Sequence, residues 1–251
     1  ALPNAVCRFT AMSSGVIVTS GLHALSSTLI RCVPTPASGA VDMWKVEILQ
    51  NGVDPEPSPY PISFTTYDLS AVRVSSLDPP GGPRGSATMV TVHGQGFAQF
   101  GNGQLVCRIG GSTNTPAVFL DANRSLCKVP PLGVASSIAV TVSLNNGTAG
   151  TFASDVAVFT AYNPPYVASA MPTQGNAMGG TKVTIYGAGF TALSPFASVR
   201  ANLLRCKFGR AEAPPVEALS HTDSQVVCVT PWGEGSHQPV RVALNGLDFT
   251  S

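Results

Sequence analysis

The sequence predicts an all-β protein built from three similar domains in tandem. A pair of cysteines is followed, three times, by an Asn-Gly turn and a closing strand. The turns are Asn51-Gly52, Asn146-Gly147 and Asn245-Gly246, and each lies 17 to 19 residues after the second cysteine of its pair. A repeat period of about 95 residues is typical of tandem domains. The 25 glycines and 21 prolines suit short strands joined by many turns.

An alternating strand leads into each of these turns. Residues 138–144 alternate between apolar and small or polar side chains, and residues 240–244 repeat the pattern before the third turn. Residues 44–48 do so before the first turn, with a phase that differs by one residue, which a bulge or a longer turn would explain. We expect Trp44 in a core. An alternating strand followed by Asn-Gly is a strong signal of a β-hairpin.

Six cysteines occur as two in each repeat, and this recurrence selects one of the 15 possible pairings. The predicted disulfides are Cys7–Cys32, Cys107–Cys127 and Cys206–Cys228. Each closes a loop of roughly 20 residues and would contribute about 3 kcal/mol in the chain-entropy model. Disulfides indicate an oxidising compartment, whereas the alternative is buried free thiols in a cytosolic protein.

Two sequons also favour the secretory route. They are Asn123-Arg124-Ser125 and Asn146-Gly147-Thr148. Asn146 falls at a predicted hairpin tip, where a glycan is tolerated, and we expect Asn123 in a loop before Cys127. We therefore predict glycosylation at both asparagines.

Composition and motifs argue against several classes of function. Charged residues make up 11% of the chain, the net charge is +1, and no basic run is present, so we expect no nucleic-acid partner. No stretch of 18 apolar residues occurs, so we expect no membrane insertion by this segment. Catalytic motifs are absent, and the four histidines are scattered without any Cys-x-x-Cys. We predict a protein that is not an enzyme and has no catalytic residues, metal site or cofactor.

A second string recurs in the last two repeats. Residues 88–97 (TMVTVHGQGF) parallel residues 181–190 (TKVTIYGAGF), 93 positions later. A Gly-x-Gly string invites comparison with a phosphate-binding loop, but no helix follows either copy. We expect the glycines to permit a turn after the strand, with Phe97 and Phe190 packed into the core.

These strings, with Cys127-Lys128-Val129-Pro130 and Cys228-Val229-Thr230-Pro231, resemble the IPT/TIG domain. This is the immunoglobulin-like fold shared by plexins and certain transcription factors. The resemblance covers essentially the whole chain and implies tandem immunoglobulin-like β-sandwiches. It implies a partial domain over residues 1–67 that lacks its first strands, and complete domains over 68–162 and 163–251. The partial domain is either a fragment boundary or is completed by a strand from another chain.

Two segments are candidates for contact with a partner. Residues 54–61 carry proline at every second position, which favours an extended segment that presents Pro57 and Tyr60. Trp232 follows the last Cys-x-x-Pro string in a predicted loop, and an exposed tryptophan is a good interface anchor. The alternatives are a stiff surface loop and a partly buried packing residue.

The resemblance implies a non-enzymatic segment of a larger secreted or cell-surface glycoprotein, because tandem IPT/TIG arrays are typical of plexin-like, growth-factor-receptor-like and fibrocystin-like ectodomains. The function expected is adhesion, recognition or extracellular architecture. The partner would be a protein or glycan on another cell or in the extracellular matrix, besides neighbouring domains of the same longer chain. Ten arginines against four lysines hint at a GC-rich genome, in which a flagellar, cell-wall or mating adhesion is natural.

Two other functions stay open. One is an accessory binding module of a secreted carbohydrate-active enzyme. The other is a segment of a Rel-type DNA-binding protein, which the neutral charge, the paired cysteines and the tandem copies disfavour.

Overall fold

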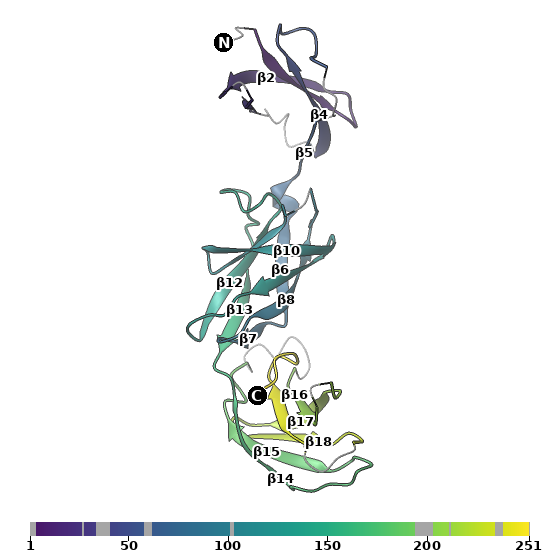
Figure 1. Ribbon diagram of the computed structural model, residues 1–251, viewed down its shortest axis with the longest axis vertical. Coiled ribbons are helices and arrows are strands. Elements are labelled where there is room, and N and C mark those ends of the chain that lie inside the picture. Colours follow the sequence, from purple (N-terminus) through teal and green to yellow (C-terminus); the bar gives the residue numbers. More distant parts are fainter. Residues whose placement is uncertain are drawn as a thin grey trace. The chain divides into compact units, whose positions relative to one another are not determined.

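The computed structural model describes residues 4–26, 28–33, 41–57, 62–100, 103–193, 203–210, 212–233 and 238–250. These residues form β-strands and one short 3-10 helix, η1 (Leu69–Ala71), so the prediction of an all-β fold is confirmed. The chain divides into two compact units, Ala1–Ala71 and Val72–Ser251. Figure 1 shows the first unit in purple and the second from blue to yellow.

The first unit is a sheet with the strand order β3-β2-β1-β4-β5. Its strands are β1 (Val6–Ala11), β2 (Ile17–Ala24), β3 (Ile30–Cys32), β4 (Asp42–Leu49) and β5 (Ile62–Thr66). The first part of β2 pairs with β1, and its last three residues pair with β3. Phe9 and Trp44 lie on the buried face with Cys7 and Ala11, so the expected core position of Trp44 is confirmed.

The second unit begins with a domain whose strand order is β6-β8-β11-β10-β9-β12-β13-β7. Its strands are β6 (Arg73–Asp78), β7 (Gly81–Pro83), β8 (Thr88–Gln95), β9 (Val106–Ile109), β10 (Thr113–Asp121), β11 (Arg124–Val129), β12 (Ser136–Ser143) and β13 (Ala157–Tyr162). Strand β10 pairs with β9 over residues 113–116 and with β11 over residues 117–121. It therefore passes from one layer of the sandwich to the other.

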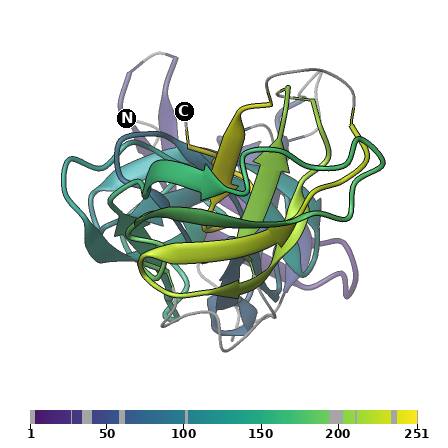
Figure 2. The same cartoon turned by 90° about the horizontal axis from the view of Figure 1, so that it is seen from below.

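The third domain has the strand order β14-β15-β18-β17-β16-β19, which matches the first six strands in the order of the second domain. Figures 1 and 2 show it in green to yellow. Its strands are β14 (Tyr166–Met171), β15 (Lys182–Ala188), β16 (Arg205–Phe208), β17 (Val216–His221), β18 (Gln225–Val229) and β19 (Val240–Ala243). Strand β17 starts beside β16 and continues beside β18, so it takes the place that β10 has in the second domain.

The recurring Gly-x-Gly-Phe string has the structural role that the sequence predicts. Phe97 and Phe190 are buried, and the glycine before each phenylalanine has a positive φ, 71° at Gly96 and 81° at Gly189. The earlier glycines, Gly94 and Gly187, sit where a β-carbon would overlap a backbone carbonyl of the neighbouring strand and press on the phenylalanine ring. Both domains therefore need glycine here because the strands approach closely.

Replacement of Gly94 by alanine should lower the free energy of unfolding by about 1–3 kcal/mol, the usual cost of overpacking a core. The added methyl group would overlap the Arg73 carbonyl and the Phe97 ring. Gly85→Ala is the matched control, because a β-carbon at residue 85 meets nothing within 4 Å. Thermal unfolding of both variants checks this expectation, and equal midpoints would contradict the steric argument.

A cross-strand ion pair lies on the first unit. Arg8 and Glu47 are register partners on β1 and β4, and the Arg8 Nη2 atom lies 2.8 Å from the Glu47 Oε2 atom. The Lys45 Nζ atom lies 2.7 Å from the Glu47 Oε1 atom. Hydrogen bonds from Lys45 and then Arg8 hold the pKa of the Glu47 carboxyl below its ordinary value, while partial desolvation opposes them.

The ion pair makes the stability of the first unit depend on pH. Because the folded pKa of Glu47 is lowered, its contribution is present above the unfolded pKa of about 4.3 and is lost as the pH falls through the folded value. Glu47→Gln should therefore reduce the loss of thermal stability between pH 7 and pH 3. Glu56→Gln, at an exposed position, is the control and should leave that loss unchanged.

Candidate interaction surfaces

The first unit leaves part of its inner face uncovered. Its strand order, β3-β2-β1-β4-β5, corresponds to β11-β10-β9-β12-β13 of the second domain. Phe64 pairs with Trp44 as Phe159 pairs with Ile138, so the two phenylalanines are equivalent. Phe159 is 2% exposed and Phe64 is 39% exposed. In the second domain β6 lies against β13, and no strand among the described residues of the first unit takes that place.

The second and third domains meet at a joint inside the second unit. Tyr162, the last residue of β13, is 3% exposed and belongs to the core of the third domain. Burial, and then the neighbouring carboxylate of Asp248, raise the pKa of the Tyr162 phenol above its ordinary value. Gly81 lies so close to Leu193 of the third domain that a β-carbon at residue 81 would overlap that side chain. Residues of both domains therefore pack against each other at the joint.

A turn of the third domain hydrogen-bonds across this joint. We call residues 245–248 (Asn-Gly-Leu-Asp) the capping turn. The Asn245 side chain is buried, and its Oδ1 atom accepts the N–H groups of Leu247 and Asp248. Its Nδ2 atom donates to the Gly81 carbonyl at 2.9 Å and to the Asp248 carboxylate at 2.8 Å. The Thr88 hydroxyl donates to the same carboxylate at 2.9 Å.

These joint residues were not among the sites predicted from the sequence. The Asn-Gly dipeptide by itself predicts a turn and carries no information about a partner across the joint. The available signal was the string Asn-Gly-x-Asp, which occurs at residues 51–54 and again at residues 245–248. The string at residues 145–148 (NNGT) lacks the aspartate.

The six cysteines lie in three disulfides: Cys7–Cys32, Cys107–Cys127 and Cys206–Cys228. These are the pairs that the repeat selects. The Cα atoms of each pair lie 6.0–6.4 Å apart, within the range usual for disulfides. In the second domain the bridge joins β9 to β11, the two partners of the crossing strand β10. The bridge therefore ties one layer of the sandwich to the other.

Both sequon asparagines are exposed. Asn123 lies in the tight turn between β10 and β11 rather than in a longer loop, and its N–H donates to the Asp121 carboxylate. Asn146 adopts a φ of 49° within the connection from β12 to β13, which spans residues 144–156. The Asn-Gly signal therefore marks a turn inside a long connection. Glycosylation at both asparagines stays a prediction.

Trp232 is 63% exposed, so the alternative interpretation as a partly buried packing residue is wrong. Its loop is held by a hydrogen bond from the Gly233 N–H to the Ala177 carbonyl, at 3.1 Å. Gly179 packs directly on the backbone of Pro231 and Trp232. Pro57 is exposed, and Tyr60 lies outside the described residues. A partner contact at any of these residues stays a prediction.

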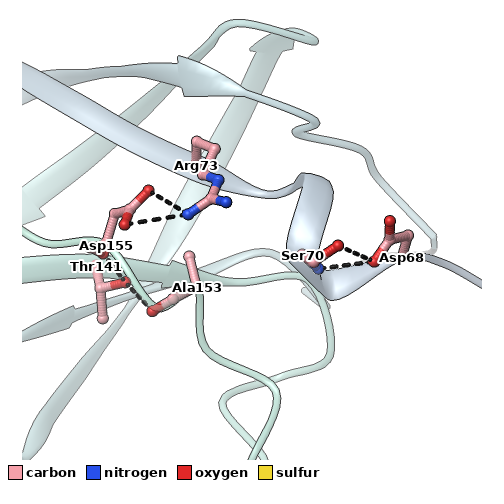
Figure 3. A network of polar contacts seen from close by, with 6 residues as sticks. All are labelled: Asp68, Ser70, Arg73, Thr141, Ala153 and Asp155. Atoms are coloured by element: carbon pink, nitrogen blue, oxygen red, sulfur yellow. Dashed lines mark hydrogen bonds and ion pairs between the residues drawn. The ribbon is translucent and has the colours of Figure 1, made fainter.

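Local polar contacts lie at the end of the first unit and at the start of the second unit (Figure 3). Arg73 on β6 forms an ion pair with Asp155 at 3.1 Å, and the Thr141 hydroxyl donates to the carbonyls of Ala153 and Asp155. Asp68 accepts the N–H and hydroxyl of Ser70 at the start of η1. Because the Arg73 and Asp155 side chains are half exposed, their ion pair contributes little, about 0–1 kcal/mol.

The described part of the chain contains no group of three or more His, Cys, Asp or Glu side chains placed to hold a metal ion. Within the same residues, no helix has the length and apolar character needed to cross a membrane.

A family model described as the IPT/TIG domain matches residues 73–160 and 165–251. The chain therefore belongs to the IPT/TIG domain family and contains this domain in tandem. Comparison with curated proteins found no match.

The solved structures that match this chain include a plexin extracellular region, an adhesin and a surface glycan-binding protein. The full extracellular region of plexin A4, domains 1 to 10, is 16% identical over 92% of this chain, with a TM-score of 0.49. The Escherichia coli adhesin FdeC is 16% identical over 80% of this chain and 68% of its own, with a TM-score of 0.32. The Prevotella bryantii surface glycan-binding protein PbSGBP-B is 16% identical over 65% of this chain and 34% of its own, with a TM-score of 0.24. The chain spans 18% of that plexin chain, and at these identities the likeness concerns the fold alone.

A double-mutant cycle measures the coupling free energy between Thr88 and Asp248 across the joint. Thr88→Val and Asp248→Ala each remove one partner of the hydrogen bond across it. Because the two groups are direct hydrogen-bond partners and Thr88 is buried, we expect a coupling free energy of about 0.5–3 kcal/mol in unfolding experiments. Thr88→Val combined with Asp223→Ala is the control, since Asp223 hydrogen-bonds instead to Thr191. A coupling near zero for the first pair would show that the joint does not hold in solution.

Proposed function

We propose that this chain is a non-enzymatic segment of a larger secreted or cell-surface glycoprotein that acts in adhesion, recognition or extracellular architecture. The observation that carries the proposal is one disulfide in each of three repeats, because disulfides persist in oxidising compartments. The exposure of both sequon asparagines is compatible with attached glycans. The partner we propose is a protein or glycan on another cell or in the extracellular matrix.

The joint gives this proposal a physical basis. The hydrogen bonds of Asn245, Thr88 and Asp248 are directional, and the burial of Asn245 and Thr88 limits competition from water. Tyr162 packs into the third domain beside them. A joint of this kind holds two domains in one arrangement, so the loops of both face a partner at a fixed spacing. That property suits a structural or recognition role, in which surface loops on rigid sandwiches carry the binding.

We also propose the domain limits predicted from the sequence: a partial domain over 1–67 and complete domains over 68–162 and 163–251. The matched ranges, 73–160 and 165–251, lie within the last two. The strand order of the first unit and the exposure of Phe64 support a partial domain, because the described residues up to 67 include no equivalents of β6, β7 and β8.

Trp232 is the contact residue that we propose first, with Pro57 and Tyr60 on the proline-rich segment as a second candidate. Trp232 presents a large apolar surface from a loop whose backbone is fixed by Gly179 and Gly233. A preorganised aromatic residue loses little conformational entropy when it binds, which makes it an effective anchor.

Peptide mapping of the natively sourced protein under non-reducing conditions tests the compartment, with and without deglycosylation. The proposal predicts the three cystines within their repeats and a glycan on Asn123 or Asn146. Free thiols together with unmodified asparagines would overturn the extracellular assignment. An intracellular binding role would then explain the tandem domains better.

A further inference from the structure

We infer that the turn formed by Asn51, Gly52, Val53 and Asp54 is a second capping turn, which docks on the end of an IPT/TIG domain. We assign the third domain of a second copy of this chain as the domain on which the turn docks, in a head-to-tail contact. The inference concerns the chain itself and does not depend on its compartment.

The first unit reproduces the capping turn bond by bond. The Asn51 Oδ1 atom accepts the N–H groups of Val53 at 2.9 Å and Asp54 at 2.8 Å, and its Nδ2 atom donates to the Asp54 carboxylate at 3.0 Å. In the third domain, Asn245 makes the same three hydrogen bonds at 3.1, 2.9 and 2.8 Å. The side chains that cross the joint are therefore prearranged in the same way in both turns.

The backbone conformations of the two turns also correspond. Gly52 and Gly246 have φ values of 79° and 78°. A β-carbon at residue 52 would meet the carbonyl of Asn4, and one at residue 246 would meet the carbonyl of Leu203. Asn4 and Leu203 each lie three residues before the first cysteine of their repeat. The turn thus occupies the same place on both domains.

Only one of the two turns has its partner within the described residues. The turn at residues 245–248 buries Asn245 and bonds to Gly81 and Thr88 of the second domain. Residues 51–54 are all exposed, and Val53 is 71% exposed. An amide donor and a carboxylate acceptor, held ready at an exposed turn, fit a surface that supplies a carbonyl oxygen and a hydroxyl group.

This turn is not a general feature of the fold. The second domain carries Asn145, Asn146, Gly147 and Thr148 at the corresponding place. There the Ser143 hydroxyl accepts the N–H groups of Asn145 and Gly147, and no carboxylate is present in the turn. The fold therefore forms a turn at this place without the Asn-Gly-x-Asp string.

The third domain offers the receiving surface. Thr181 corresponds to Thr88 and Gly175 to Gly82, because a β-carbon on either glycine would overlap the matching threonine. The hydrogen bond from Gly233 to Ala177 likewise corresponds to that from Leu132 to Arg84. These two contacts repeat part of the end of the second domain that receives the capping turn, including its threonine hydroxyl.

The same end of the third domain exposes apolar surface beside the threonine. Met178 is 74% exposed and Trp232 is 63% exposed, on two loops that hydrogen-bond to each other. No charged residue occurs between residues 172 and 181. A small contact of this kind gives weak association, and its head-to-tail geometry leads to short linear assemblies rather than closed dimers.

A disulfide-trapping experiment on the full chain tests the contact. Asp54→Cys in one preparation and Thr181→Cys in another would bring two thiols together, because Asp248 and Thr88 are hydrogen-bonded in the existing joint. We expect mixed dimers on mild oxidation, at a yield at least tenfold above that of Asp54→Cys mixed with Ser112→Cys. Ser112 is an exposed turn residue of the second domain. Equal yields from the two mixtures would overturn the inference.

Sedimentation velocity of the unaltered chain gives a second measurement that needs no added cysteine. The weight-average mass should rise with protein concentration, and Asn51→Ala should weaken this association about tenfold. Asn145→Ala, in the turn that lacks the aspartate, is the matched control and should leave it unchanged. A mass independent of concentration, or equal effects of the two alanine variants, would also overturn the inference.

Discussion

A strand that changes partners along its length holds each repeat together. Strands β2, β10 and β17 each begin beside the strand that carries the first cysteine and end beside the strand that carries the second. The disulfide then joins the two partner strands across the sandwich. Without this crossing, each sheet would have an exposed apolar face, because a sheet buries that face only against a second layer.

The repeats differ in how completely a second layer of strands covers the apolar face of the sheet. In the second domain β6 lies against β13, and Phe159 is buried. In the first unit the equivalent Phe64 is 39% exposed, although its own strand and the neighbouring strands have the same order. The comparison shows how much of the core depends on strands distant in sequence. The local sequence pattern is sufficient for the strands to form a sheet, but burial of the apolar face of that sheet requires strands from elsewhere in the sequence.

Sequence recurrence predicted those features that short-range geometry controls. The cysteine pairs, the buried Phe97 and Phe190, and the glycine turns before them all repeat, and each is set by neighbours within one or two strands. The joint could not be predicted in this way. The Asn245 side chain acquires its partner from Gly81, 164 residues earlier, and no local pattern contains that contact. The exposure of Trp232 likewise depends on how two loops pack.

Polar groups of Asn245 and Thr88, both buried, fix the second and third domains to each other. Measurement of ¹⁵N relaxation tests this claim most directly. A fixed joint predicts one shared rotational correlation time for the amides of both domains. Two separate correlation times, each near that of an independent domain, would show that the Asn245–Gly81 and Thr88–Asp248 hydrogen bonds do not hold the domains together and would contradict the account.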